Sequence, residues 1–359
     1  MLYSSLPQLH YRSAAPSSEG AFFGRLSTAR FLLHIQYKIS PQKFSCGIVK
    51  FSPDAIMVLS STKGRGSMNF LLAILSASAH SVSSVSLRLY QTKLQKSVAD
   101  LRLYQGFSAF VAAVLYWVLN GFSLKLETAG LLLALCYGLD LVLTGITVSI
   151  CYQCGPMSLT SVISNACVVL PIAVGCIFYD ESLNLNQIIG CVLLFITFVL
   201  PCLESGDRSG KISWKWFPLI FLAFFFNGMG AVLLNIYGRV ASAAGRNAYL
   251  TIGYFTCAVF YLIVSLFHHR KMNLKPGKGF FSPLLAIILA GSATGSFLGN
   301  GILMALNTRM PATILYPMVN GGIGVLVAIV SCTVFKEKLT KLKFIAILTG
   351  VASIIFLNI

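Results

Sequence analysis

Ten apolar runs of about 20 residues follow one another along this chain of 359 residues, and they limit its fold more than any other feature. A run of this length, when helical, matches the thickness of the hydrocarbon core of a membrane. Within lipid every backbone N–H and C=O must be bonded inside the protein, and a helix achieves this within one segment. The alternating pattern of a barrel strand is absent from these runs. The sequence therefore predicts an all-α integral membrane protein with ten transmembrane helices.

The expected helices all lie after residue 67. They are Asn69–Tyr90, Tyr104–Asn120, Thr128–Ser149, Met157–Tyr179, Gln187–Leu203, Trp216–Tyr237, Ala248–Phe267, Pro283–Leu306, Ala312–Phe335 and Lys343–Leu357.

Composition agrees with a membrane location and excludes a soluble globular protein. Hydrophobic residues make up 56% of the chain and charged residues only 10%, whereas soluble domains carry about 25% charged residues. The net charge of +17 does not indicate nucleic-acid binding, because the basic residues lie singly or in pairs between apolar runs, where they meet lipid headgroups. The expected partners are thus membrane lipids and a small-molecule substrate, with no nucleic acid and no cofactor.

Residues 1–67 form a polar segment without an apolar run long enough to span a membrane. The stretch from Thr62 to Ser67, directly before Met68, is rich in residues encoded by purine-rich codons, which are typical of a bacterial ribosome-binding site. One hypothesis is that translation starts at Met68. The alternative is a disordered cytoplasmic tail.

The ten runs divide into two similar sets of five. Shifts of 147 to 156 residues bring similar residues together in order: His80 on Asn227, Asp100 on Asn247, Gly106 on Gly253, Pro156 on Pro311, Asn165 on Asn320, and Glu181 on Glu337. The sequence therefore predicts two five-helix repeats, 68–203 and 215–359, joined by a polar linker, 204–214. Because five is odd, the second repeat enters the membrane from the opposite face, and inverted repeats are typical of secondary transporters.

Each repeat ends with an apolar run, an acidic residue, a short polar turn and a second apolar run. The first copy of this pattern runs from Phe178 to Asn184 and on into Gln187–Gly190, and the second runs from Phe335 to Thr340 and on into Phe344–Val351. The pattern resembles the EamA-type transporters of the drug/metabolite transporter superfamily, and the resemblance covers residues 68–359.

The resemblance implies two inverted repeats around a central cavity, in a bacterial plasma membrane. It implies a secondary active transporter that moves small organic metabolites or drugs, as an exporter, by alternating access. A lipid-linked substrate flippase or a nucleotide-sugar-type carrier on the same scaffold is the alternative. The stretch from Leu87 to Lys93 resembles the nucleotide-sugar carriers of that superfamily.

Asp140 is the most informative single residue, because it lies in the middle of an apolar run. A carboxylate at the bilayer centre costs roughly 2.5–3.5 kcal/mol, so it should face the interior of the bundle. Low-dielectric surroundings favour a carboxyl group that holds its proton. Proton coupling or capture of a cationic substrate is one hypothesis for Asp140, and a hydrogen-bonded structural role is the other.

Further polar residues within the runs are candidates for lining a substrate cavity. They are His80, Thr144, Asn165, Asn227, Asn300, Tyr316 and Asn320. His80 and Asn227, and likewise Asn165 and Asn320, occupy equivalent positions of the two repeats, so each pair is expected near the axis that relates them. The alternative is that these side chains only join helices to one another, with His80 bonded to a serine one turn away.

Glycines and prolines mark expected packing sites and bends. Gly291, Gly295 and Gly299 form a ridge that permits close approach of another helix, and a moving interface is a second hypothesis for it. Pro171 and Pro317 lie inside runs and should kink them. Glu181 and Glu337 are expected to cap helices at the ends of runs.

No catalytic function is predicted. The sequence shows no hydrolase triad, phosphate-binding loop or metal-ligand cluster, and Cys151 and Cys154 form a lone C-x-x-C without a second pair. We therefore expect no enzyme activity, no bound metal, and energy from an ion or substrate gradient.

The loop charges bear on orientation. One set of loops holds Lys93, Lys96, Arg102, Arg208, Lys211, Arg270, Lys271, Lys275, Lys278, Lys336, Lys338 and Lys341, and the other holds Lys125, Arg239, Arg246 and Arg309. This bias favours termini outside the cell, whereas the family resemblance implies termini inside. We follow the resemblance and expect the termini in the cytoplasm; the sequence does not indicate the oligomeric state.

Overall fold

A computed structural model of the chain describes residues 65–95, 97–154, 160, 163–204, 214–272, 282–334 and 340–358. All the described residues belong to one compact unit of the chain, Ser60–Ile359. The expectations for residues 1–64, for most of the linker 204–214 and for Glu337 therefore lie outside the described residues.

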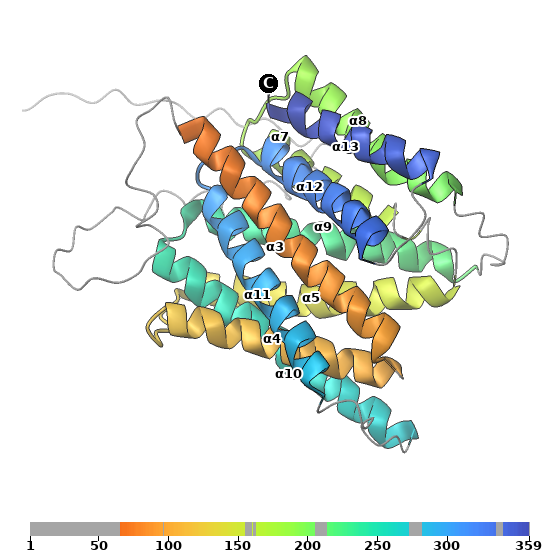
Figure 1. Ribbon diagram of the computed structural model, residues 1–359. Coiled ribbons are helices and arrows are strands. Elements are labelled where there is room, and N and C mark those ends of the chain that lie inside the picture. Colours follow the sequence, from red (N-terminus) through yellow and green to blue (C-terminus); the bar gives the residue numbers. More distant parts are fainter. Residues whose placement is uncertain are drawn as a thin grey trace, which may run out of the picture. The chain divides into compact units, whose positions relative to one another are not determined.

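The described residues form helices throughout the expected apolar runs (Figure 1). The helices are α3 (Arg65–Lys93), α4 (Val98–Leu119), α5 (Thr128–Cys154), the short 3-10 helix η2 (Ala166–Val168), α7 (Val169–Phe178), α8 (Leu185–Glu204), α9 (Trp216–Val240), α10 (Ala243–Met272), α11 (Pro283–Leu306), α12 (Ala312–Thr333) and α13 (Lys341–Asn358).

Local sequence signals explain where several of these helices begin. The Ser97 hydroxyl accepts a hydrogen bond from the Asp100 backbone N–H and caps α4. The Ser282 hydroxyl does the same for Leu285 at the start of α11, where Pro283 occupies the first turn. Serine caps supply acceptors that the first turn of a helix lacks, and proline fits there because its missing N–H would be unbonded anyway.

Eight helices of the described part are long and apolar enough to cross a membrane, namely α3, α4, α5, α9, α10, α11, α12 and α13. By the length and composition of these helices, the chain is a multi-pass membrane protein. The fourth and fifth expected helices correspond to shorter apolar segments, Ile163–Phe178 and Leu185–Leu200.

The fourth expected helix differs from the prediction because it is not one continuous α-helix. Ala166–Val168 form a 3-10 turn, and α7 starts only at Val169. Pro171 explains the break, because it has no N–H to bond the carbonyl group of Cys167 four residues earlier, and its ring crowds that carbonyl. The predicted bend at Pro171 is thus a change of helix type, whereas Pro317 lies inside an unbroken α12.

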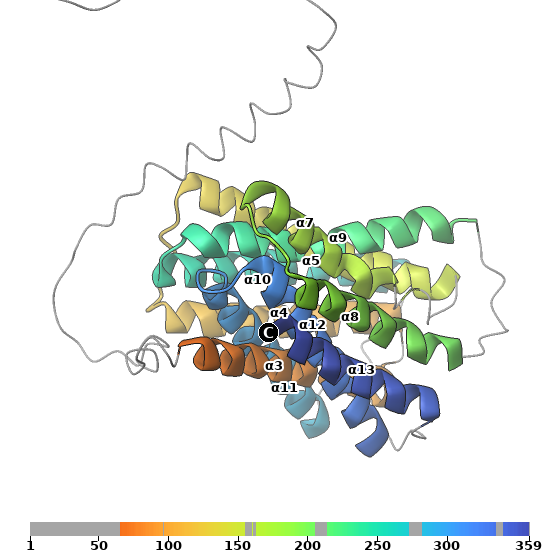
Figure 2. The same ribbon diagram turned by 90° about the horizontal axis from the view of Figure 1, so that it is seen from above.

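The helices form a bundle with two helix pairs at opposite sides. α8 packs on α13 at one side and α4 packs on α10 at the other, and α3, α5, α7, α9, α11 and α12 lie between these pairs. Figure 2 shows the same arrangement from above. α3 packs along α11 and α12, while α9 packs along α5 and α7.

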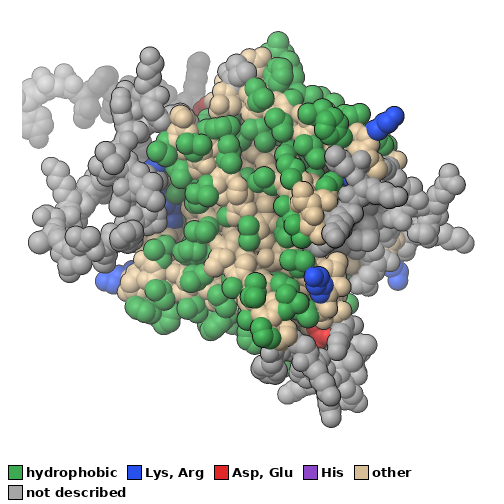
Figure 3. All heavy atoms as spheres, viewed as in Figure 1, with side chains coloured by type: hydrophobic (Ala, Val, Ile, Leu, Met, Phe, Trp, Pro, Cys, Tyr) green, Lys and Arg blue, Asp and Glu red, His purple; other side chains and the backbone are tan. Residues whose placement is uncertain are grey.

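Apolar side chains cover the outside of the bundle. Large hydrophobic residues exposed on the helices include Leu132, Ile177, Phe195, Phe221 and Ile287. The face shown in Figure 3 is mostly hydrophobic, and its few Lys and Arg side chains lie mainly toward the margins. Such a surface suits lipid contact, as the composition predicts.

Candidate functional site

Asp140 lies inside the bundle on α5 with only 5% of its surface exposed. Its Oδ1 has no hydrogen-bond partner among the described residues, and the same holds for the hydroxyl oxygens of Thr144, one turn further along α5, and of Tyr249 on α10. Buried polar atoms are bonded in the great majority of cases, so each exception requires a reason. Unused bonding capacity on a carboxylate, a hydroxyl and a phenol indicates a place where a proton or a polar ligand can bind.

A glycine on the neighbouring helix makes room for the Asp140 carboxylate. A Cβ atom at Gly230 of α9 would lie 2.7 Å from the Asp140 Oδ2 and 3.9 Å from the Tyr137 ring. Any larger residue at 230 would therefore press on the carboxylate. The lack of a side chain at this position is what brings α9 against Asp140.

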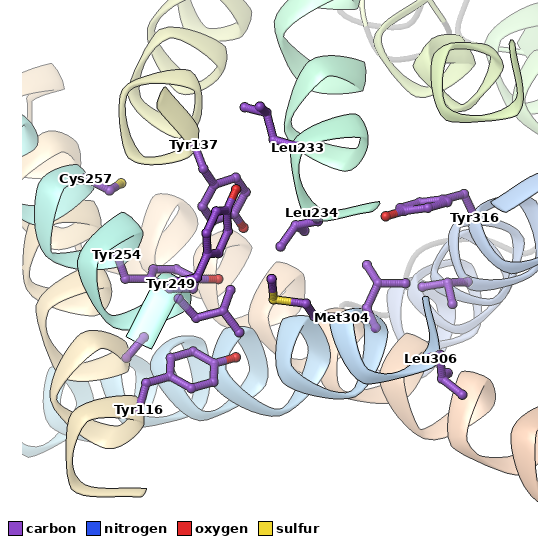
Figure 4. Close-up of a cluster of buried hydrophobic side chains, with 14 of the residues drawn as sticks. Tyr116, Tyr137, Leu233, Leu234, Tyr249, Tyr254, Cys257, Met304, Leu306 and Tyr316 are labelled. Carbon is purple, nitrogen blue, oxygen red and sulfur yellow. The ribbon is translucent and has the colours of Figure 1, made fainter. Parts of the chain in front are cut away.

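A group of buried tyrosines lies beside Asp140. Tyr137 of α5 contacts Tyr249 and Tyr254 of α10, with ring centroids 5.6 Å and 6.3 Å apart, and Tyr254 stacks on Tyr116 of α4 at 5.9 Å. In Figure 4 the hydroxyl groups of Tyr254 and Tyr316 point toward the centre of the cluster from opposite sides, with Leu234 and Met304 between them. Of these rings, Tyr137 shares with Asp140 the space beside Gly230, and Tyr249 interacts electrostatically with Asp140.

Asn300 and Tyr316, both predicted cavity residues, are bonded within this core. The Asn300 side-chain amide donates to the Tyr254 hydroxyl. The Tyr316 hydroxyl donates to the Ala231 carbonyl at 2.8 Å and accepts from the Asn307 amide at 3.3 Å. Both side chains therefore join helices of the second expected repeat.

His80 and Asn227 each pack against a helix of the opposite expected repeat. The His80 ring on α3 lies where a Cβ at Gly299 of α11 would fall, at 2.8 Å. Asn227 on α9 donates to the Ser164 carbonyl at 2.8 Å, directly before the 3-10 turn. Asn227 thus bonds the backbone at the helix break, and His80 fills the space beside a glycine.

Asn165 and Asn320 do not form the expected inward-facing pair. Asn165 is exposed at the start of the 3-10 turn. Asn320 donates back to the Tyr316 carbonyl within α12 at 2.9 Å. The sequence match between Asn165 and Asn320 stays a prediction, and a 3-10 turn follows Asn165 whereas Asn320 lies inside the continuous helix α12.

The glycine ridge of α11 faces the serine-rich face of α3. A Cβ at Gly291 would lie 2.6 Å from the Ser86 hydroxyl oxygen, and one at Gly295 would lie 2.7 Å from the Ser83 backbone nitrogen. The Ser76 hydroxyl donates to the Gly299 carbonyl at 2.9 Å. The ridge is therefore a site of close helix packing.

A second polar cluster lies where α9 ends and α12 begins, and we call this end of the bundle the Glu181 end. Glu181, in the turn between α7 and α8, forms an ion pair with Arg239 near the end of α9. Its two carboxylate oxygens accept hydrogen bonds from the Ala312 and Thr313 backbone N–H groups at 3.0 Å and 2.9 Å. The predicted capping role of Glu181 is confirmed, although the helix that it caps belongs to a distant part of the chain.

The surroundings of Glu181 favour its ionised form. Burial by itself raises the pKa of this carboxyl group, but the hydrogen bonds from Thr313, Arg239 and Ala312 outweigh burial and hold the pKa below its usual value of 4.5. The Arg239 guanidinium also lies 3.9 Å from the centre of the Tyr179 ring. Glu181 therefore remains ionised at neutral pH, beside the Arg239 guanidinium.

Sequence reasoning did not identify Arg239, Asn235 and Asn307 as members of one cluster. The Arg239 Nε donates to the Asn235 side-chain oxygen at 3.0 Å, and the Asn235 amide donates to the Asn307 side-chain oxygen at 2.9 Å. The sequence did contain one signal for this cluster. Asn235 and Arg239 lie four residues apart near the end of an apolar run, and residues at that spacing share one face of a helix.

Comparison with known proteins adds evidence on the fold alone. No protein-family model matches the chain, and no curated protein matches it. Among proteins of known structure, 28 chains match it. One, described only as "Crystal structure of protein", has a TM-score of 0.61 and 12% sequence identity, and the match covers 80% of this chain and 97% of the other. The arrangement of helices therefore resembles that of a solved protein.

Proposed function

We propose that the protein is a secondary active transporter that moves small organic molecules by alternating access between two inverted five-helix repeats, with Asp140 as the site of proton coupling. In this proposal α3, α4, α5, α7 and α8 form the first repeat and α9 to α13 form the second. The proposal includes the expectation that all ten apolar segments cross the membrane, α7 and α8 among them.

The observation that carries the proposal is a symmetry in the contacts between helices. If each helix of the first repeat is replaced by its counterpart in the second, and the reverse, one observed contact becomes another observed contact. Exchange turns the α3–α11 contact into α9–α5, α5–α10 into α11–α4, and α3–α12 into α9–α7. The α4–α10, α7–α12 and α8–α13 contacts turn into themselves. All these contacts occur in the bundle, as expected for two copies related by a two-fold axis, whereas in the described part of the chain the α12–α13 contact has no comparable counterpart between α7 and α8.

The directions of the first helices of the two halves support inversion. Tyr90, near the end of α3, packs with Leu285 and Ile288 at the start of α11. Asn235, near the end of α9, bonds Asn307 directly after the end of α11. Since α11 is a single rod, α3 and α9 run in opposite directions.

Individual contacts repeat in the same way. Asp140 contacts Gly230, and the counterparts of these positions, at shifts of 155 and 147 residues, are Gly295 and Ser83, which also contact each other. In one half the interface joins a carboxylate to a glycine, and in the other it joins a glycine to a serine. Only one half thus places a carboxyl group at this position, which suits a coupling residue that acts once in each cycle.

Vesicles loaded with a small-molecule extract of the cells that make the protein provide the test. Purified protein is reconstituted, a pH gradient is applied, and the retained solutes are identified by mass spectrometry. We expect a few solutes to be lost faster than from protein-free vesicles, with loss that depends on the gradient and saturates.

Other outcomes separate the competing functions. Unselective, unsaturable loss of many solutes would indicate a pore. No solute loss, together with movement of labelled lipid between leaflets, would indicate a flippase. Either result would overturn the proposal.

A further inference from the structure

We propose that the Glu181–Arg239 pair is a latch that holds the transporter closed at the Glu181 end and so biases its two access states unequally. This inference rests on the function proposed above. In alternating access, contacts between the two halves at one end must form in one state and break in the other.

The latch joins the two halves of the protein directly. Glu181 belongs to the first half, whereas Arg239 and the first turn of α12 belong to the second. One carboxylate thus accepts two backbone hydrogen bonds and an arginine ion pair. Hydrogen bonds between charged partners are roughly twice as strong as neutral ones, and here they are largely shielded from water.

The latch extends into the core through a chain of side chains. From Arg239 the hydrogen bonds continue through Asn235 to Asn307, and Asn307 donates to the Tyr316 hydroxyl on α12. Asn235 is fully buried and Asn307 is 3% exposed. The ends of α9 and α11 and the first turns of α12 are therefore tied together at this end of the bundle.

The position that corresponds to Arg239 in the other half is not an arginine, and the counterpart of Glu181, Glu337, lies outside the described residues. A shift of 147 residues places Arg239 on Thr92, whose hydroxyl only donates back to its own helix at the Arg88 carbonyl, at 3.0 Å. The α9–α11 contact is also more extensive than its counterpart between α3 and α5. The arginine of the Glu181–Arg239 pair is thus not repeated in the other half, and in the structure this pair closes the Glu181 end.

Hydrogen–deuterium exchange of the purified full-length protein tests the latch. Glu181→Gln keeps the size of the side chain and removes its charge, and Arg239→Lys keeps the charge but changes the geometry of donation. Asp180→Asn is the matched control, because Asp180 is the exposed carboxylate next to Glu181 in the same turn. Each variant is compared with the wild type at neutral pH.

The expected result is reciprocal. In Glu181→Gln, amides at the start of α12, residues 312–316, exchange about tenfold faster or more. At the same time amides at the opposite end, residues 98–104 of α4 and 285–288 of α11, exchange more slowly, because that end closes when the Glu181 end opens. Arg239→Lys changes the exchange rates at both ends in the same directions as Glu181→Gln, but by smaller factors. Asp180→Asn leaves the exchange rates at both ends unchanged.

Two outcomes would overturn the latch. Faster exchange only around Glu181, with the opposite end unchanged, would make the pair a local structural contact. Unchanged exchange at both ends would show that the pair does not hold this end closed. Solute loss from wild-type vesicles is measured on the same preparation, so a failed latch in an active carrier is distinguished from failure of the proposed function.

Discussion

The carboxylate of Asp140 occupies the space that a side chain at Gly230 would fill, with Oδ2 only 2.7 Å from the position of the missing Cβ atom. Two helices, α5 and α9, therefore meet at a carboxyl group that is buried in an apolar bundle. The arrangement keeps the charge-bearing group away from lipid and against the backbone of the other half of the protein. A substitution at either residue should therefore change the energetic effect of a substitution at the other.

Gly230→Ala is expected to displace the Asp140 carboxylate and to destabilise the protein by about 1–3 kcal/mol, the usual cost of overpacking a filled interior. In an Asp140→Ala background the same change should cost much less, since the carboxylate is gone. Thermal unfolding in detergent of the two single variants and the double variant measures this coupling. Gly245→Ala is the control, because the nearest atoms to its Cβ position are two hydroxyl oxygens at 3.3 Å, which need to move only slightly to admit a methyl group. If the losses of stability in the two single variants simply add up in the double variant, the contact between Gly230 and Asp140 is contradicted.

Removing the Tyr249 hydroxyl should leave stability unchanged or improved. This buried hydroxyl has no hydrogen-bond partner among the described residues, so Tyr249→Phe removes an unpaired polar atom. Tyr316→Phe removes a hydroxyl that bonds Ala231 and Asn307, and should cost about 0.5–1.5 kcal/mol. The melting temperatures of the two variants test this prediction. An equal fall in melting temperature in both variants would show that the Tyr249 hydroxyl has a hydrogen-bond partner in the protein. A transport defect in a stable Tyr249→Phe would assign its hydroxyl to the substrate or proton.

The contribution of Glu181 to stability should depend on pH in one specific window. Burial raises the pKa of Glu181, but the bonds from Thr313, Arg239 and Ala312 bring it below its usual 4.5. A depressed pKa in the folded state means that the stabilisation is fully present above about pH 4.5 and is lost as the pH falls through the lower folded value. The difference in stability between wild type and Glu181→Gln should therefore be constant from pH 7 to about 5 and shrink below that. A difference that already shrinks between pH 7 and 6 would show that the pKa is not depressed.

Hydropathy was sufficient to locate the helices, because the requirement to bond every backbone group within lipid acts on each segment separately. Thus α11 matches its predicted limits, Pro283 and Leu306, without change. The fourth segment was less predictable. Its 3-10 turn depends on how the Pro171 ring and the freed Cys167 carbonyl are accommodated by neighbouring helices, and hydropathy carries no information on that.

The candidate site was only partly predictable for a similar reason. Asp140 stood out because a carboxylate in an apolar run needs a special environment. The Glu181–Arg239 pair joins residues 58 positions apart, and the hydrogen bond from Ala312 spans 131 positions. Such contacts depend on which helix ends meet, and that arrangement follows from packing of the whole bundle. Asn165, which the expected match between repeats placed inside the bundle, is exposed.

Asp140→Asn provides the sharpest test of proton coupling. The amide has nearly the same size as the carboxyl group but cannot release a proton, so the variant should fold normally and lose only the dependence of transport on the pH gradient. Asp180→Asn is the matched control, since it makes the same substitution at an exposed turn and should transport as the wild type does. Solute flux in vesicles is measured with and without the gradient, and melting temperature verifies folding. Gradient-driven flux that persists in a stable Asp140→Asn variant would leave Asp140 a structural role and place proton coupling at another group.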